Sequence, residues 1–306
     1  MTNYIVRRLL GMLLVIWLIL TLTFILAYLI PAEPARAVAG PRASPETIAQ
    51  VRKQLGLDDP LYVQYFRYLG RVLRGDLGTS YRQRLPVSQI ILHRLPATIE
   101  LAVLGVLLEL MLGIPVGIIS AVWQRSIWDR GFMLLSLVAV SAPTFLLGLL
   151  LLYLFAYRIP LFPLGGPGGL SHLALPVLTL GLAGAAWYGR MLRSSMLDIL
   201  HADYVRTARA KGLAERAVMV RHVLRNAIQP IVTMAGMDLG YYLGGIVLTE
   251  AVFSWPGIGW EMWRAVTNVD IPLAVGTITF AAMAIVVMNF LVDLLYSAID
   301  PRVRLS

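Results

Sequence analysis

The chain of 306 residues has no cysteine, which excludes disulfide bonds, thiolate metal ligands and cysteine nucleophiles. Charge is scarce as well: Asp, Glu, Lys and Arg make up 14% of the residues, whereas a soluble domain carries about a quarter. The four histidines lie in loops or near the ends of apolar runs, and no two have the spacing of a metal-ligand pair on a helix. These absences disfavour an intramembrane enzyme, which needs a nucleophile with its base, or metal ligands, at membrane depth.

A nucleotide-binding loop is also missing. The pattern Gly-x-x-x-x-Gly-Lys-Ser/Thr occurs nowhere, and the glycines between residues 165 and 169 are not followed by lysine. We therefore expect that the chain binds no cofactor and does not hydrolyse ATP itself.

Hydrophobic residues, in contrast, make up 58% of the sequence, and the mean hydropathy is +0.74. Continuous apolar runs of about 20 residues recur, which is the length a helix needs to cross a bilayer. Ala37-Val38-Ala39 resembles a signal-peptide cleavage site, but the run before it is about twice as long as a signal's. We predict an all-α integral membrane protein with six transmembrane helices: Leu9–Ile30, Ala97–Val122, Gly131–Tyr157, Leu173–Leu192, Ile231–Thr249 and Leu273–Ser297.

Basic residues orient these spans. The net charge of +9 would suggest nucleic-acid binding in a soluble protein, but here the cations flank apolar runs. If both termini are cytoplasmic, the arginine-rich stretch from Arg190 to Arg225 lies inside, and each short outer loop holds one basic residue, Arg158 or Arg264. The segment 31–96 is basic too and would lie outside, which argues against this orientation, although long loops count little in the positive-inside rule.

The chain divides into three parts at this level: the first span (1–30), an extracytoplasmic segment (31–96) and a five-helix core (97–306) that includes a cytoplasmic loop (194–230). Within the outer segment, Ser44-Pro45-Glu46 predicts a helix start that ends near Gly56. A second amphipathic helix is predicted over Tyr62–Leu73, and a turn over Gly75–Ser80. These helices either lie on the bilayer surface or form a platform for an outside partner.

The cytoplasmic stretch 204–230 interrupts the apolar runs with six basic residues and a single acid, Glu215. Gly212 breaks its helical pattern, so we predict two short helices with a bend, and Pro230 marks the entry to the next span. Composition alone leaves two interpretations open: a segment resting on anionic lipid, or a helix that enters a groove of a soluble partner.

A few residues interrupt the predicted spans. Glu109 and Asp238 are acids at membrane depth, so each should face protein or water, through an internal hydrogen bond or along a substrate route. Pro143 predicts a kink or a gate element in the third span. Small-residue rows predict close helix packing in two spans: Gly181, Ala185 and Gly189 in the fourth, and Gly236, Gly240 and Gly244 in the fifth.

The stretch from Tyr204 to Pro230 resembles the cytoplasmic loop of membrane permeases from binding-protein-dependent ABC importers. A glycine and a loop-ending proline mark that loop, and here Gly212 and Pro230 are 18 residues apart. The general motif starts with Glu-Ala-Ala, whereas Arg206-Thr207-Ala208 stands here, as in the dipeptide, oligopeptide and nickel branch. Further motifs of the same branch cover most of the chain: "GDLGTSY" (75–81), "RLPATIELAV" (94–103), "RHVLRNAIQP" (221–230), "EAVFSWPGIG" (250–259) and "LVDLLYSAIDPRVR" (291–304).

The resemblance implies a type I importer permease in a bacterial or archaeal inner membrane. Its partners would be a second permease, two cytoplasmic ATPase subunits that bind ATP and Mg²⁺, and an extracytoplasmic solute-binding protein. The ATPase-coupling residues it implies are Tyr204, Arg206, Thr207, Ala208, Arg209, Lys211, Gly212 and Leu213. A translocation route or gate would involve Glu109, Pro143, Asp238 and Tyr241. Contacts to the binding protein would involve Glu250, Trp255, Pro256 and Gly257, although Trp255 and Trp260 equally suit anchoring at the lipid interface.

Peptides are the cargo that this branch favours, with glutathione and nickel as alternatives. Few histidines and no cysteine argue mildly against direct metal handling. A self-contained channel is a different class of function, and it would transport without an ATPase.

Overall fold

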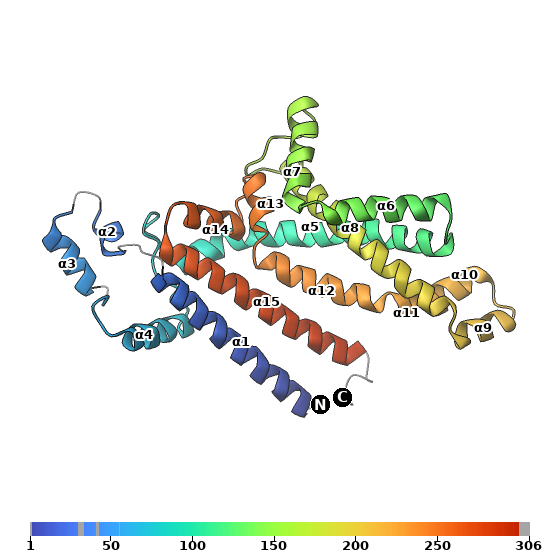
Figure 1. Ribbon diagram of the computed structural model, residues 1–306, viewed down its shortest axis with the longest axis horizontal. Helices are drawn as coiled ribbons and strands as arrows, with labels where there is room; N and C mark the ends of the chain where they lie inside the picture. Colours follow the sequence, from blue (N-terminus) through green and yellow to red (C-terminus); the bar gives the residue numbers. More distant parts are fainter. Residues whose placement is uncertain (1, 30–33, 41–42, 55, 300–306) are drawn as a thin grey trace. The chain divides into compact units, whose positions relative to one another are not determined.

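The computed structural model describes residues 2–29, 34–40, 43–54 and 56–299, and nearly all of its regular structure is helical (Figure 1). Within these ranges the only β-type pairing is an isolated bridge between Thr79 and Pro86. The helices are α1 Thr2–Leu29, α2 Pro34–Ala39, α3 Pro45–Gln54, α4 Leu61–Leu73, α5 Val87–Val122, α6 Ile127–Ser141, α7 Thr144–Leu152, the π-helix η1 Tyr153–Arg158, α8 Leu170–Leu200, α9 Asp203–Ala210, α10 Glu215–Ala217, the π-helix η2 Val218–Leu224, α11 Arg225–Ala227, α12 Gln229–Leu243, α13 Val247–Val252, α14 Ile258–Thr267 and α15 Ile271–Ile299.

Four helices are long and apolar enough to cross a membrane: α1, α5, α8 and α15. A fifth span results if α6 and the continuous helix α7–η1, which meet at a sharp bend, count as one. The helical membrane fold predicted from hydrophobic length is therefore confirmed, with four or five such helices among the described residues. Helix α12 has 15 residues and falls short of the length that a span needs.

The third predicted span is not continuous. Helix α6 ends at Ser141, Ala142 is extended (φ −86°, ψ 135°), and Pro143 caps α7, which departs at 100°. Proline lacks the N–H that would continue the helix and disfavours helical geometry in the residue before it. The bend was predicted at the correct residue, and it is a complete break between two helices instead of a kink within one helix over Gly131–Tyr157.

The fifth predicted span, Ile231–Thr249, also breaks. Helix α12 ends at Leu243, and a separate short helix, α13, begins at Val247. Gly245 lies between them with φ +102°, a left-handed conformation that a helix interior does not contain. A Cβ at Gly245 would lie 3.1 Å from the backbone nitrogen of Gly259, so the close approach of the two segments also requires glycine there.

The chain forms two compact units. One comprises residues 1–98, 243–247 and 256–306, and the other comprises 99–242 and 248–255. In the first unit α1 runs beside α15 (Figure 1), and Arg8 forms an ion pair of 2.9 Å with Asp293 near one end of this pair.

The second unit contains the close helix packing that the glycine row of the fourth span predicts. Helices α5 and α8 approach until a Cβ at Gly117 would lie 2.9 Å from the carbonyl oxygen of Gly189. A Cβ at Gly113 would lie 3.1 Å from the carbonyl oxygen of Ala185. In the other row, a Cβ at Gly244 would lie 3.1 Å from Ile285 Cδ1 of α15, within the first unit.

Both helices predicted within the segment 31–96 are present, and α5 begins within this segment, at Val87 instead of Ala97. The Thr47 N–H donates to Ser44 Oγ at 3.2 Å, which caps α3, and the second predicted helix is α4. The turn over Gly75–Ser80 is present, and Asp270 holds it from outside the segment. The Ser80 hydroxyl donates to Asp270 Oδ2 at 2.5 Å, and the Tyr81 N–H donates to Oδ1 at 3.1 Å.

Candidate functional site

The loop between α8 and α12 contains the two predicted short helices, and Gly212 makes the bend between them. Its N–H donates to the Arg209 carbonyl at 2.9 Å, and the Leu213 N–H donates to the Ala208 carbonyl at 3.4 Å. This pair of hydrogen bonds is a Schellman cap, which places the residue after the helix in the left-handed region. Gly212 has φ +76°, so the backbone itself requires glycine at this position.

The inner face of α9 attaches the loop to the body of the second unit. Val205 and Ala208 are buried in one apolar cluster with Tyr188, Leu192 and Met196 of α8. The side chain of Ala208, one of the coupling residues that the resemblance implies, is therefore not available to a partner helix. Tyr204, Leu213 and Val220 are exposed apolar side chains of the same loop and remain available.

Two of the expected partner-facing cations are already engaged within the loop. Arg206 forms an ion pair with Asp203, and Arg209 donates two hydrogen bonds to the Glu215 carboxylate, at 3.1 and 2.7 Å. The ion pair between Arg209 and Glu215, called the clamp below, connects the residues on either side of the bend at Gly212. Lys211, at the tip of the bend, is exposed, and the Thr207 hydroxyl donates to the Asp203 carbonyl at 2.9 Å.

The hydrogen bond from Arg209 lowers the pKa of Glu215 below its ordinary value of 4.5. A carboxylate whose pKa is lowered by folding stabilises the fold above its ordinary pKa, and this contribution is lost as the pH falls through the lowered value. The clamp should therefore be intact at neutral and mildly acidic pH.

Substitution of Glu215 by Gln should open this clamp at any pH. Because both side chains are largely exposed, we expect a cost of at most about 1 kcal/mol, which is up to about fivefold faster amide exchange at residues 209–215. Hydrogen–deuterium exchange of the purified protein measures this, with Lys211→Gln as the control that removes a charge from the same bend. Equal amide exchange in the parent and in Glu215→Gln would contradict a role for the clamp.

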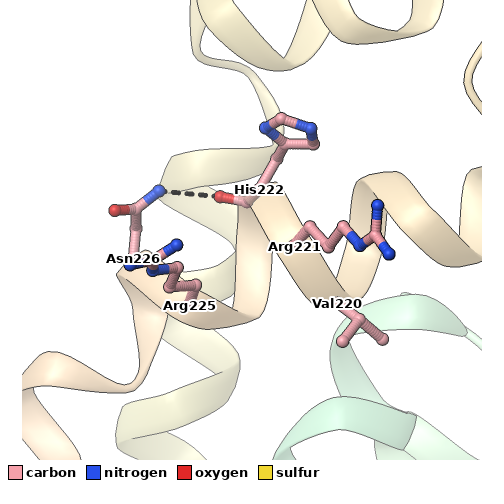
Figure 2. A pocket seen from close by; sticks show the side chains of 5 residues that line it. All are labelled: Val220, Arg221, His222, Arg225 and Asn226. Carbon is pink, nitrogen blue, oxygen red and sulfur yellow. Dashed lines mark hydrogen bonds between the residues drawn. The ribbon is translucent and has the colours of Figure 1, made fainter.

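On η2 and α11 the loop presents a basic depression lined by Val220, Arg221, His222, Arg225 and Asn226 (Figure 2). The Asn226 amide donates to the His222 carbonyl at 2.8 Å and to the Tyr204 hydroxyl at 3.2 Å, which connects the two arms of the loop. The motif at 221–230 thus supplies both exposed charge and an internal brace.

The two acids at membrane depth both face tyrosines inside the second unit. Glu109 of α5 is fully buried, and the Tyr242 hydroxyl donates to its Oε1 at 2.5 Å. The Tyr188 hydroxyl donates to Asp238 Oδ2 at 2.6 Å. Glu109 lies against Gly184, where any side chain would occupy the space of the carboxylate. The internal hydrogen bonds that were expected as one alternative for both acids are therefore present, and they link α5, α8 and α12.

Removing the Tyr242 hydroxyl should destabilise this link. Glu109 Oε2 accepts no hydrogen bond within the described chain, so Tyr242→Phe leaves a buried carboxyl group without a donor. We expect a loss of about 1–3 kcal/mol in the free energy of unfolding. Thermal unfolding of the purified protein measures this loss, and Tyr241→Phe is the matched control because the neighbouring Tyr241 is exposed. Equal melting temperatures would show that the buried hydrogen bond contributes nothing.

The loop 250–257 is largely internal. Glu250 and Trp255 are buried, the Trp255 N–H donates to the Glu250 carbonyl at 2.9 Å, and Gly257 caps α14. Anchoring of Trp255 at the lipid interface was one of the two interpretations of this residue, and its burial argues against it. Ser254 is exposed with φ +49° and forms the tip of the turn, followed by half-buried Pro256.

The sequence analysis did not predict an ion pair between α6 and α8 in the second unit. Asp129 of α6 accepts two hydrogen bonds from Arg193 of α8, at 2.6 and 2.8 Å, and a third from the Arg125 N–H at 2.8 Å. The signal that could have found Asp129 is Ser126, which caps α6 by accepting from the Asp129 N–H at 3.2 Å. Arg193 carries no comparable local signal, because its partner lies 64 residues away.

Comparisons with known proteins cover nearly the whole chain. Residues 113–305 match the family described as "Binding-protein-dependent transport system inner membrane component", and residues 1–102 match the N-terminal family of the same components. The chain is 42% identical over 304 residues to the glutathione transport system permease protein GsiC of Salmonella paratyphi A, covering 99% of both chains. It is 40% identical to the protein of that name from Escherichia coli K12, with the same coverage.

The fold also resembles that of a solved transporter structure. It is the MetNI methionine ABC transporter in inward-facing conformations, with a TM-score of 0.58 over 69% of this chain and 97% of that chain. At 18% sequence identity the similarity concerns the fold alone.

Proposed function

The chain belongs to the family of inner-membrane components of binding-protein-dependent transport systems, in the dipeptide and oligopeptide branch of ABC importer permeases, and from this premise we propose that it imports glutathione or short peptides. It is a multi-pass inner-membrane permease subunit and not itself an enzyme. The observation that supports this choice of cargo is the 42% identity to a glutathione permease over 99% of both chains. Nickel remains the alternative cargo of the same architecture.

We assign the chain six spans with both termini in the cytoplasm. The fifth span in chain order then combines α12 and α13, which together run from Gln229 to Val252. The basic loop 194–230 then lies inside, and the segment 31–96 lies outside, between the first span and the core that begins at residue 97. The positive-inside rule supports this orientation because the short outer loops are poor in cations.

The assembly contains a second permease, two ATPase subunits that bind ATP and Mg²⁺, and an outer solute-binding protein. This chain binds no cofactor of its own in that assembly. The loop α9–α11 docks on an ATPase through exposed Tyr204, Leu213 and Val220, with Lys211 and the arginines of the basic depression available to acidic partner groups. The tip at Ser254 and Pro256 faces the binding protein, and buried Glu250 and Trp255 support it from behind.

Motion of the docked loop reaches the bilayer through its two attachments. Helix α8 leads into the loop and α12 leads out of it, and hydrogen bonds from Tyr188 and Tyr242 tie these helices to the carboxylates of Asp238 and Glu109. Closure of the ATPase pair would therefore move α8 and α12 together, with α5 attached. Pro143 at the bend and exposed Tyr241 line the route or its gate in this scheme.

The test uses the complete transporter in proteoliposomes, with ATP on the ATPase side and labelled glutathione, a dipeptide or Ni²⁺ on the binding-protein side. We expect ATP-dependent uptake of glutathione or the dipeptide. Omission of the ATPase subunits is the control that separates an importer from a channel. Uptake that persists without them, or that is confined to Ni²⁺, would overturn the proposal.

A further inference from the structure

Helix α4 of the first unit has more apolar surface than its neighbours cover. Tyr65, Tyr68 and Val72 face inward, where the ring of Phe24 of α1 packs edge-to-face against Tyr65 and at a tilt against Tyr68, with ring centroids 5.3 and 5.7 Å away. Beside this covered face, Tyr62, Phe66 and Leu73 are 66%, 67% and 83% exposed. At 100° per residue these three lie within about 40° of one another, so they form one strip along the helix.

The depth of α4 is set by its hydrogen bonds to membrane spans. The Tyr65 hydroxyl pairs with Thr21 Oγ1 at 2.7 Å, and the Tyr68 hydroxyl pairs with Thr23 Oγ1 at 3.1 Å. Both threonines lie inside the apolar stretch Val6–Leu26 of α1. With a rise of 1.5 Å per residue they are roughly 5–8 Å from the end of that stretch. Tyr68 also reaches Thr279, inside the apolar stretch of α15, at 3.4 Å.

The charge on α4 has one sign and lies away from the strip. Arg67 and Arg71 within the helix and Arg74 just after it are exposed, and the helix contains no acidic residue. Arg67 forms an ion pair of 2.5 Å with Asp59, which precedes the helix, so Arg71 and Arg74 are the cations left for lipid. An apolar strip beside a cationic face is the pattern of a helix in the plane of the membrane surface, where cations meet phosphates and apolar side chains enter the acyl boundary. Such helices are buried by about 5–10 Å, which agrees with the level of Thr21 and Thr23.

We infer that the Tyr62–Phe66–Leu73 strip of α4 inserts into the headgroup boundary of the phospholipid bilayer, with Arg71 and Arg74 against lipid phosphates. The occupant of the strip is lipid because α4 is attached within the apolar part of two spans, where the surroundings of the chain are the bilayer. This inference rests on the proposed orientation of the spans only for the leaflet, which is then the outer one.

The absence of cysteine from the chain makes the test direct. Phe66→Cys and Leu73→Cys, with Arg74→Cys as the matched control on the polar face, are labelled with bimane in the complete transporter. The transporter is reconstituted in phosphatidylethanolamine and phosphatidylglycerol vesicles, and unsubstituted chain reports the background from partner subunits. Quenching is measured with lipid carrying a nitroxide at carbon 5 of the acyl chain, and with aqueous iodide.

We expect the lipid nitroxide to quench the labels at positions 66 and 73 at least threefold more than the label at position 74, with the reverse order for iodide. Equal iodide quenching at all three positions would place the strip in water and overturn the inference. Protection of position 66 from both quenchers would mean that a protein partner covers the strip, and would overturn it as well. Lipid quenching in vesicles without ATP-driven uptake would support this inference and contradict the proposed function.

Discussion

Alanine at position 129 should destabilise the second unit by about 3 kcal/mol, because it leaves Arg193 without its counter-charge in a largely buried site. The side chains of Asp129 and Arg193 are 4% and 23% exposed, and Asp129 accepts three hydrogen bonds, two of them from Arg193. Removing one partner of a buried pair costs more than the pair itself contributes, because the remaining charge stays desolvated. In thermal unfolding this loss corresponds to a fall in Tm on the order of 6–12 °C.

Two comparisons separate the ion pair from other effects of Asp129→Ala. Asp198→Ala removes an exposed acid from α8 and should leave the Tm within a degree or two. The double variant Asp129→Leu with Arg193→Met removes both charges, so it should melt closer to the parent than Asp129→Ala does. If Asp129→Ala and Asp198→Ala had the same Tm, the ion pair between Asp129 of α6 and Arg193 of α8 would not contribute to stability.

Valine at position 212 should reduce ATP-driven uptake by roughly 5–30-fold. Gly212 has φ +76°, and a side-chain-bearing residue in this left-handed conformation costs about 1–2 kcal/mol, which is a factor of that size in the population of the native bend. A Cβ at this position would meet no atom of the chain within 4 Å. The effect should therefore act through the backbone and the docked partner, and leave the transmembrane part intact.

Asparagine is the informative control at this position, because it tolerates the left-handed conformation. Gly212→Asn should keep most of the uptake if backbone conformation is the constraint. If Asn and Val abolish uptake equally, the partner surface excludes any side chain there. Full uptake by the Val variant, with normal membrane insertion, would remove the loop from the coupling mechanism. Co-purification of the ATPase subunits with each variant distinguishes loss of docking from loss of transport after docking.

Much of the site could be anticipated because its signals are local. The bend at Gly212, the capped start of α3 at Ser44 and the helix break at Pro143 each depend on a few neighbouring residues. Local backbone preferences act over one turn, so a single sequence contains them. The break at Gly245 escaped prediction because glycine is also common inside membrane helices, and only its contact with Gly259 distinguishes the two uses.

By itself, the sequence determined that this chain is helical, lies in a membrane and bends at Gly212, since apolar length and local backbone preference are properties of short segments. Only the tertiary structure decided which polar side chains meet: Tyr188 with Asp238, 50 residues apart, and Arg193 with Asp129, 64 residues apart. It also decided that Ala208 and Trp255 face inward while the strip on α4 faces out. Periodicity assigns a residue to a face of its helix, but what covers that face depends on how distant segments pack.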